Sequence, residues 1–484
     1  MASSATNALD TADGGRAPAK SAVLHRSLHE MPLMIERAEG NFIYLSEGRK
    51  ILDATGGAAV ACLGHGNRRL AEAMMEQVLA IEYCHSLYFA CRPVEELAQV
   101  MIDSTNGDMA RAFFVSSGSE AMEAALKFAR QYHLEKQPEE SSRVHFICRR
   151  QSYHGSTLGA LGSGGHAARR QLFEPILSTN TSLVSPCYAY RPPIAGMSTH
   201  EHVRYLEDEL EEEFQRIGPH NVAGFIAEPV VGAALGCVAP LPGYFAAVRR
   251  VCDRHGALLI FDEVMSGCGR VGPVPTEAYP SPLHAYQDPL VGVAPDVLIM
   301  GKGLGAGYQP LAAMLLSKPV VQTLMQGSGS FGHGQTFQGH PVGCRAGLEV
   351  QRIIQQDELV SNVRKQGTLL AKALHSRLDG HPNVGDIRGM GLFWGIEFVK
   401  DKATKQPFDV SKTVAWRIHQ LGLQAPYNIC LYPGGGTVDG VHGDHVLLAP
   451  AYTCSSRDIE DIVKRTGDVI ETFFQGEEKQ MRSA

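Results

Sequence analysis

The stretch that decides the fold is 295–316, which reads PDVLIMGKGLGAGYQPLAAMLL. Two short apolar runs in it, 297–300 and 311–316, have the length and composition of buried strands. The loop between them places Lys302 directly after the first run and flanks it with glycines. Glycines let a planar ligand approach the backbone, and a partly desolvated lysine has a lowered pKa and can attack an aldehyde. The stretch therefore predicts two strands joined by a loop that carries a reactive amine.

The same alternation of apolar run, turn and helical stretch extends back to Arg111 and predicts an α/β domain with a mainly parallel sheet. The other runs that we expect to be buried strands are 111–115, 143–148, 223–227 and 257–261. Ligands of such sheets gather at the carboxyl ends of the strands. The residues that follow each run are therefore the candidate site residues.

A smaller C-terminal α+β domain is expected after this sheet. Its signals are helical patterns at 348–378, strands at 392–398 and 446–449, a Gly-rich loop at 432–445 and a last helix from about Arg457. The segment 272–290, rich in Pro and aromatic residues, is expected to be a surface insertion. The predicted division is a disordered arm at 1–22, an N-terminal segment at 23–75 that packs with the small domain, a large domain at 76–340 and the small domain at 341–484.

Composition narrows the class of protein. A chain of 484 residues with 44% hydrophobic content can bury two cores, which excludes a disordered chain. The net charge of −7 comes without any long basic block, so we expect small-molecule partners and no nucleic acid. The eleven cysteines have no metal-site spacing, and no apolar run approaches the roughly 18 residues of a membrane span. We expect a soluble protein of the cytoplasm, without a metal and without a transit peptide.

Two other motifs stand where predicted strands end. Ser116–Ser117–Gly118–Ser119 follows the run 111–115 and opens a helix, whose free N–H groups and positive end could hold a phosphate. On this motif alone, a capped helix without a ligand is an equally good interpretation. Asp262 follows the run 257–261, and a buried carboxylate there needs a cationic partner, either a local arginine or a protonated pyridine nitrogen.

The three motifs together are far more specific than any one of them. A phosphate cradle, a carboxylate and a glycine-flanked lysine are what pyridoxal 5'-phosphate (PLP) requires: an anchor, a charge that keeps its ring electron-poor, and an amine that forms a Schiff base. The competing interpretation of GKGLGAG (301–307) as a dinucleotide loop fails, because the string lacks the G-x-G-x-x-G spacing.

From about Ile51 to the last helix the chain resembles the class III (ω-type) aminotransferases of PLP fold type I, the aspartate-aminotransferase-like fold. The matching strings are FFVSSGSEAMEAALKFAR (113–130), SYHG (152–155), AEPVVGA (227–233), LLIFDEVMSGCGR (258–270), PDVLIMGKGLGAGYQPLAA (295–313), HGQTFQGHPVG (333–343), GDIRGMGLFWGIEFV (385–399) and GDHVLLAP (443–450). Such a protein would be a transaminase that works by a ping-pong mechanism. The alternatives are an aminomutase or decarboxylase on the same scaffold, or a PLP-binding protein without catalysis.

The resemblance also implies roles for single residues. Ser117, Gly118 and Ser119 would bind the phosphate of PLP, and Tyr153 and Val264 would lie on the two faces of its ring. Asp262 would pair with the ring nitrogen, Lys302 would form the Schiff base, and Glu228 would lie near the ring. Thr336 would reach the phosphate of a neighbouring subunit, which implies a homodimer with shared sites. Apart from the resemblance, His154, at the cofactor, and His340 are expected to be neutral and to hydrogen-bond backbone atoms, with direct catalysis as the alternative.

For the substrate, Arg388 resembles the family arginine that grips a carboxylate; a surface salt bridge is the alternative. Some relatives cover this arginine with a glutamate, at the position of Ala233 here. We therefore expect Arg388 to have no built-in anion, so that it either stays open to carboxylates or lies in a pocket for bulkier amines. Tyr88, with Tyr83, His85 and Phe89, could line a hydrophobic pocket for an amine, although core packing is expected for at least half of this cluster. The Gly-rich loop 432–445 could be a gate over the substrate side.

Overall fold

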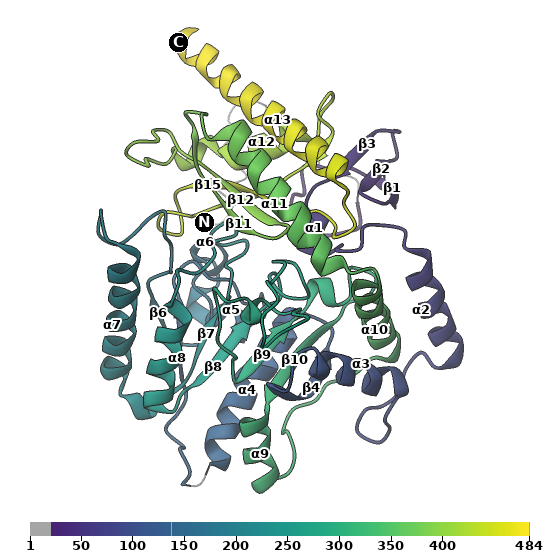
Figure 1. Cartoon of the computed structure of the whole chain (residues 1–484), viewed down its shortest axis with the longest axis vertical. Coiled ribbons are helices and arrows are strands. Elements are labelled where there is room, and N and C mark those ends of the chain that lie inside the picture. The colour runs from purple at the N-terminus through teal and green to yellow at the C-terminus, as the bar shows by residue number, and fades with distance from the viewer. Residues whose placement is uncertain (1–20, 137, 484) are drawn as a thin grey trace.

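The computed structural model describes residues 21–136 and 138–483. Its centre is a seven-stranded sheet with the order β4-β10-β9-β8-β7-β5-β6 (Figure 1). In chain order the strands are β4 (Met109–Val115), β5 (His145–Arg149), β6 (Thr181–Val184), β7 (Val222–Ala227), β8 (Leu258–Asp262), β9 (Val297–Met300) and β10 (Ala312–Ser317). Only β10 pairs antiparallel, with β4 and β9 on either side. The predicted α/β fold with a mainly parallel sheet is confirmed.

Both faces of this sheet are buried, which explains why its strands are apolar without alternation. On β8, Ile260 packs into a core cluster with the apolar face of α4 (Gly118–Glu135). The next residue, Phe261, points to the opposite face, where its ring lies 4.8 Å from that of Phe245 on α8 (Tyr244–His255). The sheet therefore holds the ends of its strands rigidly between two helical layers.

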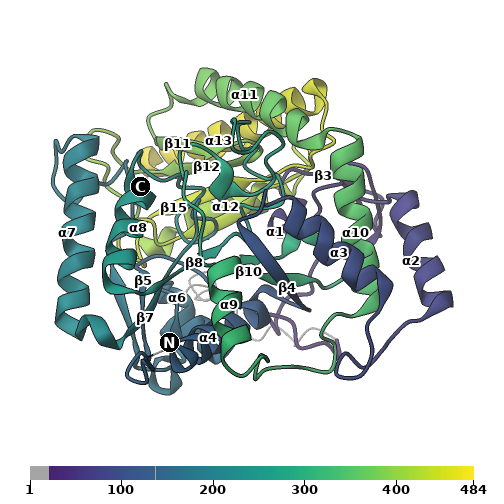
Figure 2. The ribbon, with the colours of Figure 1, turned by 60° about the horizontal axis from the view of Figure 1, so that its bottom comes forward.

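Several of the remaining helices lie toward the two edges of the sheet. Helix α7 (Thr199–Ile217) lies with α8 near the β6 edge, and α2, α3 and α10 gather near the β4 edge (Figures 1 and 2). The other helices here are α1 (Gly56–Ala59), α2 (Arg68–Ala80), α3 (Arg92–Asp103), α5 (Leu158–Gly162), α6 (Ala167–Arg170), α9 (Lys318–Gln326) and α10 (Pro341–Gln356). No helix in the described residues is both long and apolar enough to cross a bilayer.

A separate, smaller sheet has the order β11-β12-β15-β14 and is antiparallel throughout. Its strands are β11 (Val384–Met390), β12 (Phe393–Phe398), β14 (Tyr432–Gly435) and β15 (Asp444–Leu448), and the helices of this part are α11 (Leu359–Leu378), α12 (Val414–Gly422) and α13 (Ser456–Ser483). This is the predicted smaller α+β unit. The helical pattern expected at 348–378 is two helices, α10 and α11, and β11 was not expected.

A third sheet joins the beginning of the chain to this C-terminal part. Strands β1 (Ile35–Glu39), β2 (Phe42–Leu45) and β3 (Lys50–Asp53) form a meander, and β3 pairs in parallel with β13 (Ile429–Cys430). The backbone N–H of Ala449 also donates to the carbonyl of Ala54, at 2.8 Å. The domain boundaries remain predictions, and the arm expected at 1–22 lies outside the described residues except for its last two.

Candidate active site

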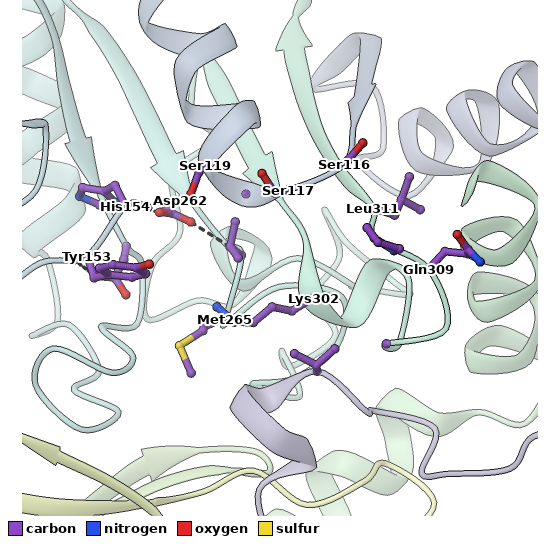
Figure 3. Close-up of a pocket in the computed structure, with 17 residues that line it drawn as sticks. Ser116, Ser117, Ser119, Tyr153, His154, Asp262, Met265, Lys302, Gln309 and Leu311 are labelled. Atoms are coloured by element: carbon purple, nitrogen blue, oxygen red, sulfur yellow. Dashed lines mark hydrogen bonds and ion pairs between the residues drawn. The ribbon is translucent and has the colours of Figure 1, made fainter. Parts of the chain in front are cut away.

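A cavity of about 420 Å³ opens where β4, β8 and β9 end (Figure 3). The structure brings nearly all the predicted cofactor residues to this one place, although they come from separate segments of the chain. Those that line it are Ser117, Gly118, Ser119, Tyr153, His154, Glu228, Asp262, Val264 and Lys302. In the described residues, no group of three or more His, Cys, Asp or Glu could hold a metal ion.

Lys302 follows the end of β9 and opens a short 3₁₀ turn, Lys302–Leu304. Its φ is +43°, a left-handed conformation that is strained for a residue with a Cβ and that aims its side chain into the cavity (Figure 3). Burial lowers the pKa of the Lys302 amine, while the carboxylates of Asp262 and Glu228 act in the opposite direction. The net lowering increases the fraction of neutral amine, which is the nucleophilic form.

Asp262 ends β8 and is only 5% exposed. One carboxylate oxygen, Oδ1, accepts a hydrogen bond from the backbone N–H of Val264 at 3.0 Å. The other, Oδ2, lies 2.8 Å from Nδ1 of His154. His154 therefore contacts a carboxylate, and the expectation that it bonds to backbone is wrong; its Nε2 has no hydrogen-bond partner in the described residues. His340 does bond to backbone, since it caps α10 and accepts from the N–H of Gly343 at 3.3 Å.

The helix N-terminus predicted as a phosphate cradle is formed by α4. Ser117 is its N-cap and accepts from the N–H of Glu120 at 3.2 Å, and Ser119 Oγ accepts from the N–H of Ser156 at 3.0 Å. The first N–H groups of a helix have no partner within it, and they point with the positive end of the dipole toward the cavity. A Cβ at Gly118 would lie 3.0 Å from Val264 Cγ2, so a larger residue would crowd the wall of the cavity.

Glu228 follows β7 and holds the backbone beside the cavity. Its two oxygens accept hydrogen bonds from the N–H groups of Tyr153, at 3.1 Å, and Gly232, at 2.9 Å. Burial raises the pKa of this carboxyl, and the charge of Asp262 adds to the effect. Glu228 therefore fixes the place of Tyr153, whose side chain lines the cavity.

Arg388 does not line this cavity, and two expectations about it are wrong. Its Nη1 lies 2.9 Å from Glu397 and 2.9 Å from Asp386, and its Nε donates to the carbonyl of Gly236 at 2.8 Å. The arginine thus has built-in anions, and because its side chain is only 11% exposed, the pair is no surface salt bridge. The antiparallel register of β11 and β12 explains this, since it sets Asp386 opposite Glu397. The motif around Arg388 does not show how β11 and β12 are paired.

Two other predicted residues lie outside the cavity of their own chain. Tyr88 is 73% exposed on the connection between α2 and α3, where its ring lies 5.1 Å from that of His85. Thr336 is exposed on the connection between α9 and α10. Sequence reasoning gave no role to seven other residues that line the cavity: Val60, Gly155, Met265, Gly307, Gln309, Pro310 and Leu311. All but Val60 lie within the matching strings, whereas Val60 stands in none of them and gave no signal.

The solved structures that this chain resembles are transaminases, so fold and cavity together define an enzyme of that class. One is an (S)-enantioselective ω-transaminase from Thermomicrobium roseum, with a TM-score of 0.84 and 31% identity over 97% of this chain and 98% of that one. Another is an ω-transaminase from Pseudomonas jessenii in complex with PMP, with a TM-score of 0.81 and 30% identity over 92% and 93%.

The particular family follows from the sequence matches. The model of the family "Aminotransferase class-III" matches residues 23–470, and the chain belongs to that family. It is 49% identical to an aminotransferase of Gibberella zeae over 92% of this chain and 85% of that protein. It is also 42% identical to an uncharacterised aminotransferase of Schizosaccharomyces pombe over 96% and 98%.

Proposed function

We propose that this aminotransferase uses PLP to move an amino group between an amine or amino acid and a keto acid or aldehyde, by a ping-pong mechanism. The observation that carries the proposal is the convergence of Lys302, Asp262 and the N-terminus of α4 on one cavity. When bound, PLP supplies an aldehyde that condenses with amines and a ring that takes up electrons. The donor set fits it, with N–H groups for a phosphate, a buried carboxylate for a cationic ring nitrogen and an amine for the aldehyde.

The residues of the chain would divide the work as follows. Ser119 and the first N–H groups of α4 bind the phosphate, while Tyr153 and Val264 hold the ring between them. Asp262, oriented by His154 and by the N–H of Val264, keeps the ring nitrogen protonated. Lys302 would hold the cofactor through its amine, and the same amine would be the tethered base that accepts the proton from the substrate Cα.

The half-reaction tests this proposal directly. Protein loaded with PLP is mixed with a panel of amines and amino acids, and the absorbance of the cofactor reports its conversion to the amino form. A transaminase keeps the amino group on the cofactor until a carbonyl substrate removes it. An aminomutase or decarboxylase needs no second substrate in each cycle, and a non-catalytic PLP-binding protein shows no conversion.

Location in the cytoplasm remains a prediction from the sequence.

We further propose a homodimer in which Thr336 contacts the phosphate bound by the partner subunit. The support is that Thr336 is exposed and lies outside the cavity of its own chain. A Thr336→Ala chain and a Lys302→Ala chain would then damage different halves of each shared site. Co-refolded heterodimers should contain one site with both lesions and one with neither, and at low PLP their activity should approach that of one intact site.

The complementation test requires that the Thr336→Ala homodimer is impaired at low PLP. We expect this impairment because the lost hydrogen bond to the phosphate would contribute about 1.5–3 kcal/mol to PLP binding. The matched control is Thr323→Ala on α9, whose hydroxyl bonds to a carbonyl of its own helix and should not affect PLP affinity. If the activity of the mixture at low PLP never exceeds the summed activities of the unmixed proteins, Thr336 acts in the site of its own chain.

A further inference from the structure

Arg169, on the short helix α6, lies next to a residue that lines the active-site cavity. Its guanidinium carbon is 4.7 Å from the centre of the Tyr153 ring, and Tyr153 is one of the residues that line the cavity. The same helix meets the hairpin between β14 and β15, since a Cβ at Gly440 would lie 2.9 Å from Cβ of Ala167. Arg169 thus stands where the large sheet domain and the loop of the small one come together beside the cavity.

The charge of Arg169 is not neutralised. Within the described residues its guanidinium has neither an ion pair nor a hydrogen bond, although the residue is only partly exposed. Its neighbour Arg170 shows the contrast, because it pairs with Glu174 at 3.0 Å and donates to three carbonyls. Arg150 likewise pairs with Glu209 at 2.9 Å. A guanidinium has five N–H donors, and those of Arg169 are free for a ligand.

The positive charge of Arg169 changes the pKa values of two groups in and beside the site. It adds to the effect of burial in lowering the pKa of Lys302. Burial and the same charge lower the pKa of His166 to about 4, so this histidine beside Tyr153 is neutral at physiological pH. Arg169 is therefore a cation without a counter-ion among the described residues, and an anion placed between it and the site would neutralise its charge.

We propose that Arg169 binds the carboxylate of an amino acid or keto acid substrate, a role that rests on the proposed transaminase function. The planar fork of a guanidinium pairs with both oxygens of a carboxylate, and the ring of Tyr153 under it restricts its orientation. Arg388, the arginine that the sequence suggested for this role, is already occupied by Glu397 and Asp386. The substrate class of this site is then compounds that carry a carboxylate besides the reacting amine or carbonyl.

The test compares substrates with and without a carboxylate on the PLP-loaded protein. Arg169→Gln should lower kcat/KM about 10- to 100-fold for amino acids such as L-alanine or 4-aminobutanoate, mainly through KM, because a charge-assisted bidentate contact is lost. Ethylamine and propylamine, which lack the carboxylate, should change less than about threefold. Arg169→Lys should restore part of the loss. Arg204→Gln on α7, whose side chain is 76% exposed, is the control and should match the wild type.

A second measurement does not depend on turnover. Butanoate, which cannot react, is titrated into the loaded protein while the cofactor absorbance is followed, and its dissociation constant should rise about 10-fold in Arg169→Gln. Equal losses for both substrate types, with unchanged butanoate binding, would mean that Arg169 only supports Tyr153 and would overturn the inference. If the wild type converted no amino donor while butanoate binding still weakened in the variant, the proposed function would fail and the anion site would stand.

Discussion

Lys302→Ala should reduce turnover to background and leave PLP removable by gel filtration. The covalent attachment is lost, and so is the tethered base that carries the proton from the substrate. The N-terminus of α4 and the carboxylate of Asp262 are unchanged, so the variant should still bind PLP at high concentration. Activity assays and the absorbance of the protein fraction after gel filtration measure the two effects separately.

The location of the covalent bond can be read from the wild type. Borohydride reduction should fix the cofactor to a single peptide that contains Lys302. Lys464→Ala provides the control, since this lysine lies on α13 with a side chain that is 71% exposed and should retain both labelling and activity. Label on any other lysine would refute the assignment.

Asp262→Asn should slow the half-reaction by roughly three orders of magnitude or more while PLP remains bound. An amide keeps the shape of the side chain, and its oxygen can still accept from the N–H of Val264. It carries no charge, however, and cannot hold the ring nitrogen protonated in this buried position. Stopped-flow absorbance of the half-reaction, at a PLP concentration that saturates the variant, gives the rate.

The control for this experiment is Asp253→Asn, a carboxylate on α8 that is 65% exposed, pairs with Arg249 and does not line the cavity. It should react as fast as the wild type. A near-normal rate for Asp262→Asn with a fully loaded cofactor would show instead that Asp262 is not the partner of the ring nitrogen.

The central sheet could be predicted because its strands are buried on both faces and therefore read as unbroken apolar runs. Each of the six expected runs overlaps one of its strands. Two of the strands that were not expected differ from these runs. β6 (TSLV) lies at the edge of the sheet and is only partly buried, and β1 (IERAE) is mostly exposed, with three charged residues among its five. Periodicity carries little information where burial does not constrain the side chains.

The cavity could be predicted where chemistry and position coincide, as at Lys302 and Asp262, since both directly follow buried strands. Partners across the fold could not be predicted in the same way. The pairing of Arg388 with Glu397 depends on the register of two strands, and the contact of His154 with Asp262 joins a loop to the end of a strand that is distant in the chain. A single sequence shows which groups are present, but it does not show which of them neutralise one another.

The pairing of β3 with β13 has a consequence for how the protein is made. Leu52 emerges from the ribosome early, whereas its partner Ile429 is synthesised near the end of translation. Until then one edge of β3 has no strand beside it, and an open strand edge is a template for pairing with other chains. Nascent or truncated chains that end before Ile429 should therefore aggregate more readily than the full-length chain, and their rescue should depend on chaperones that cover this edge.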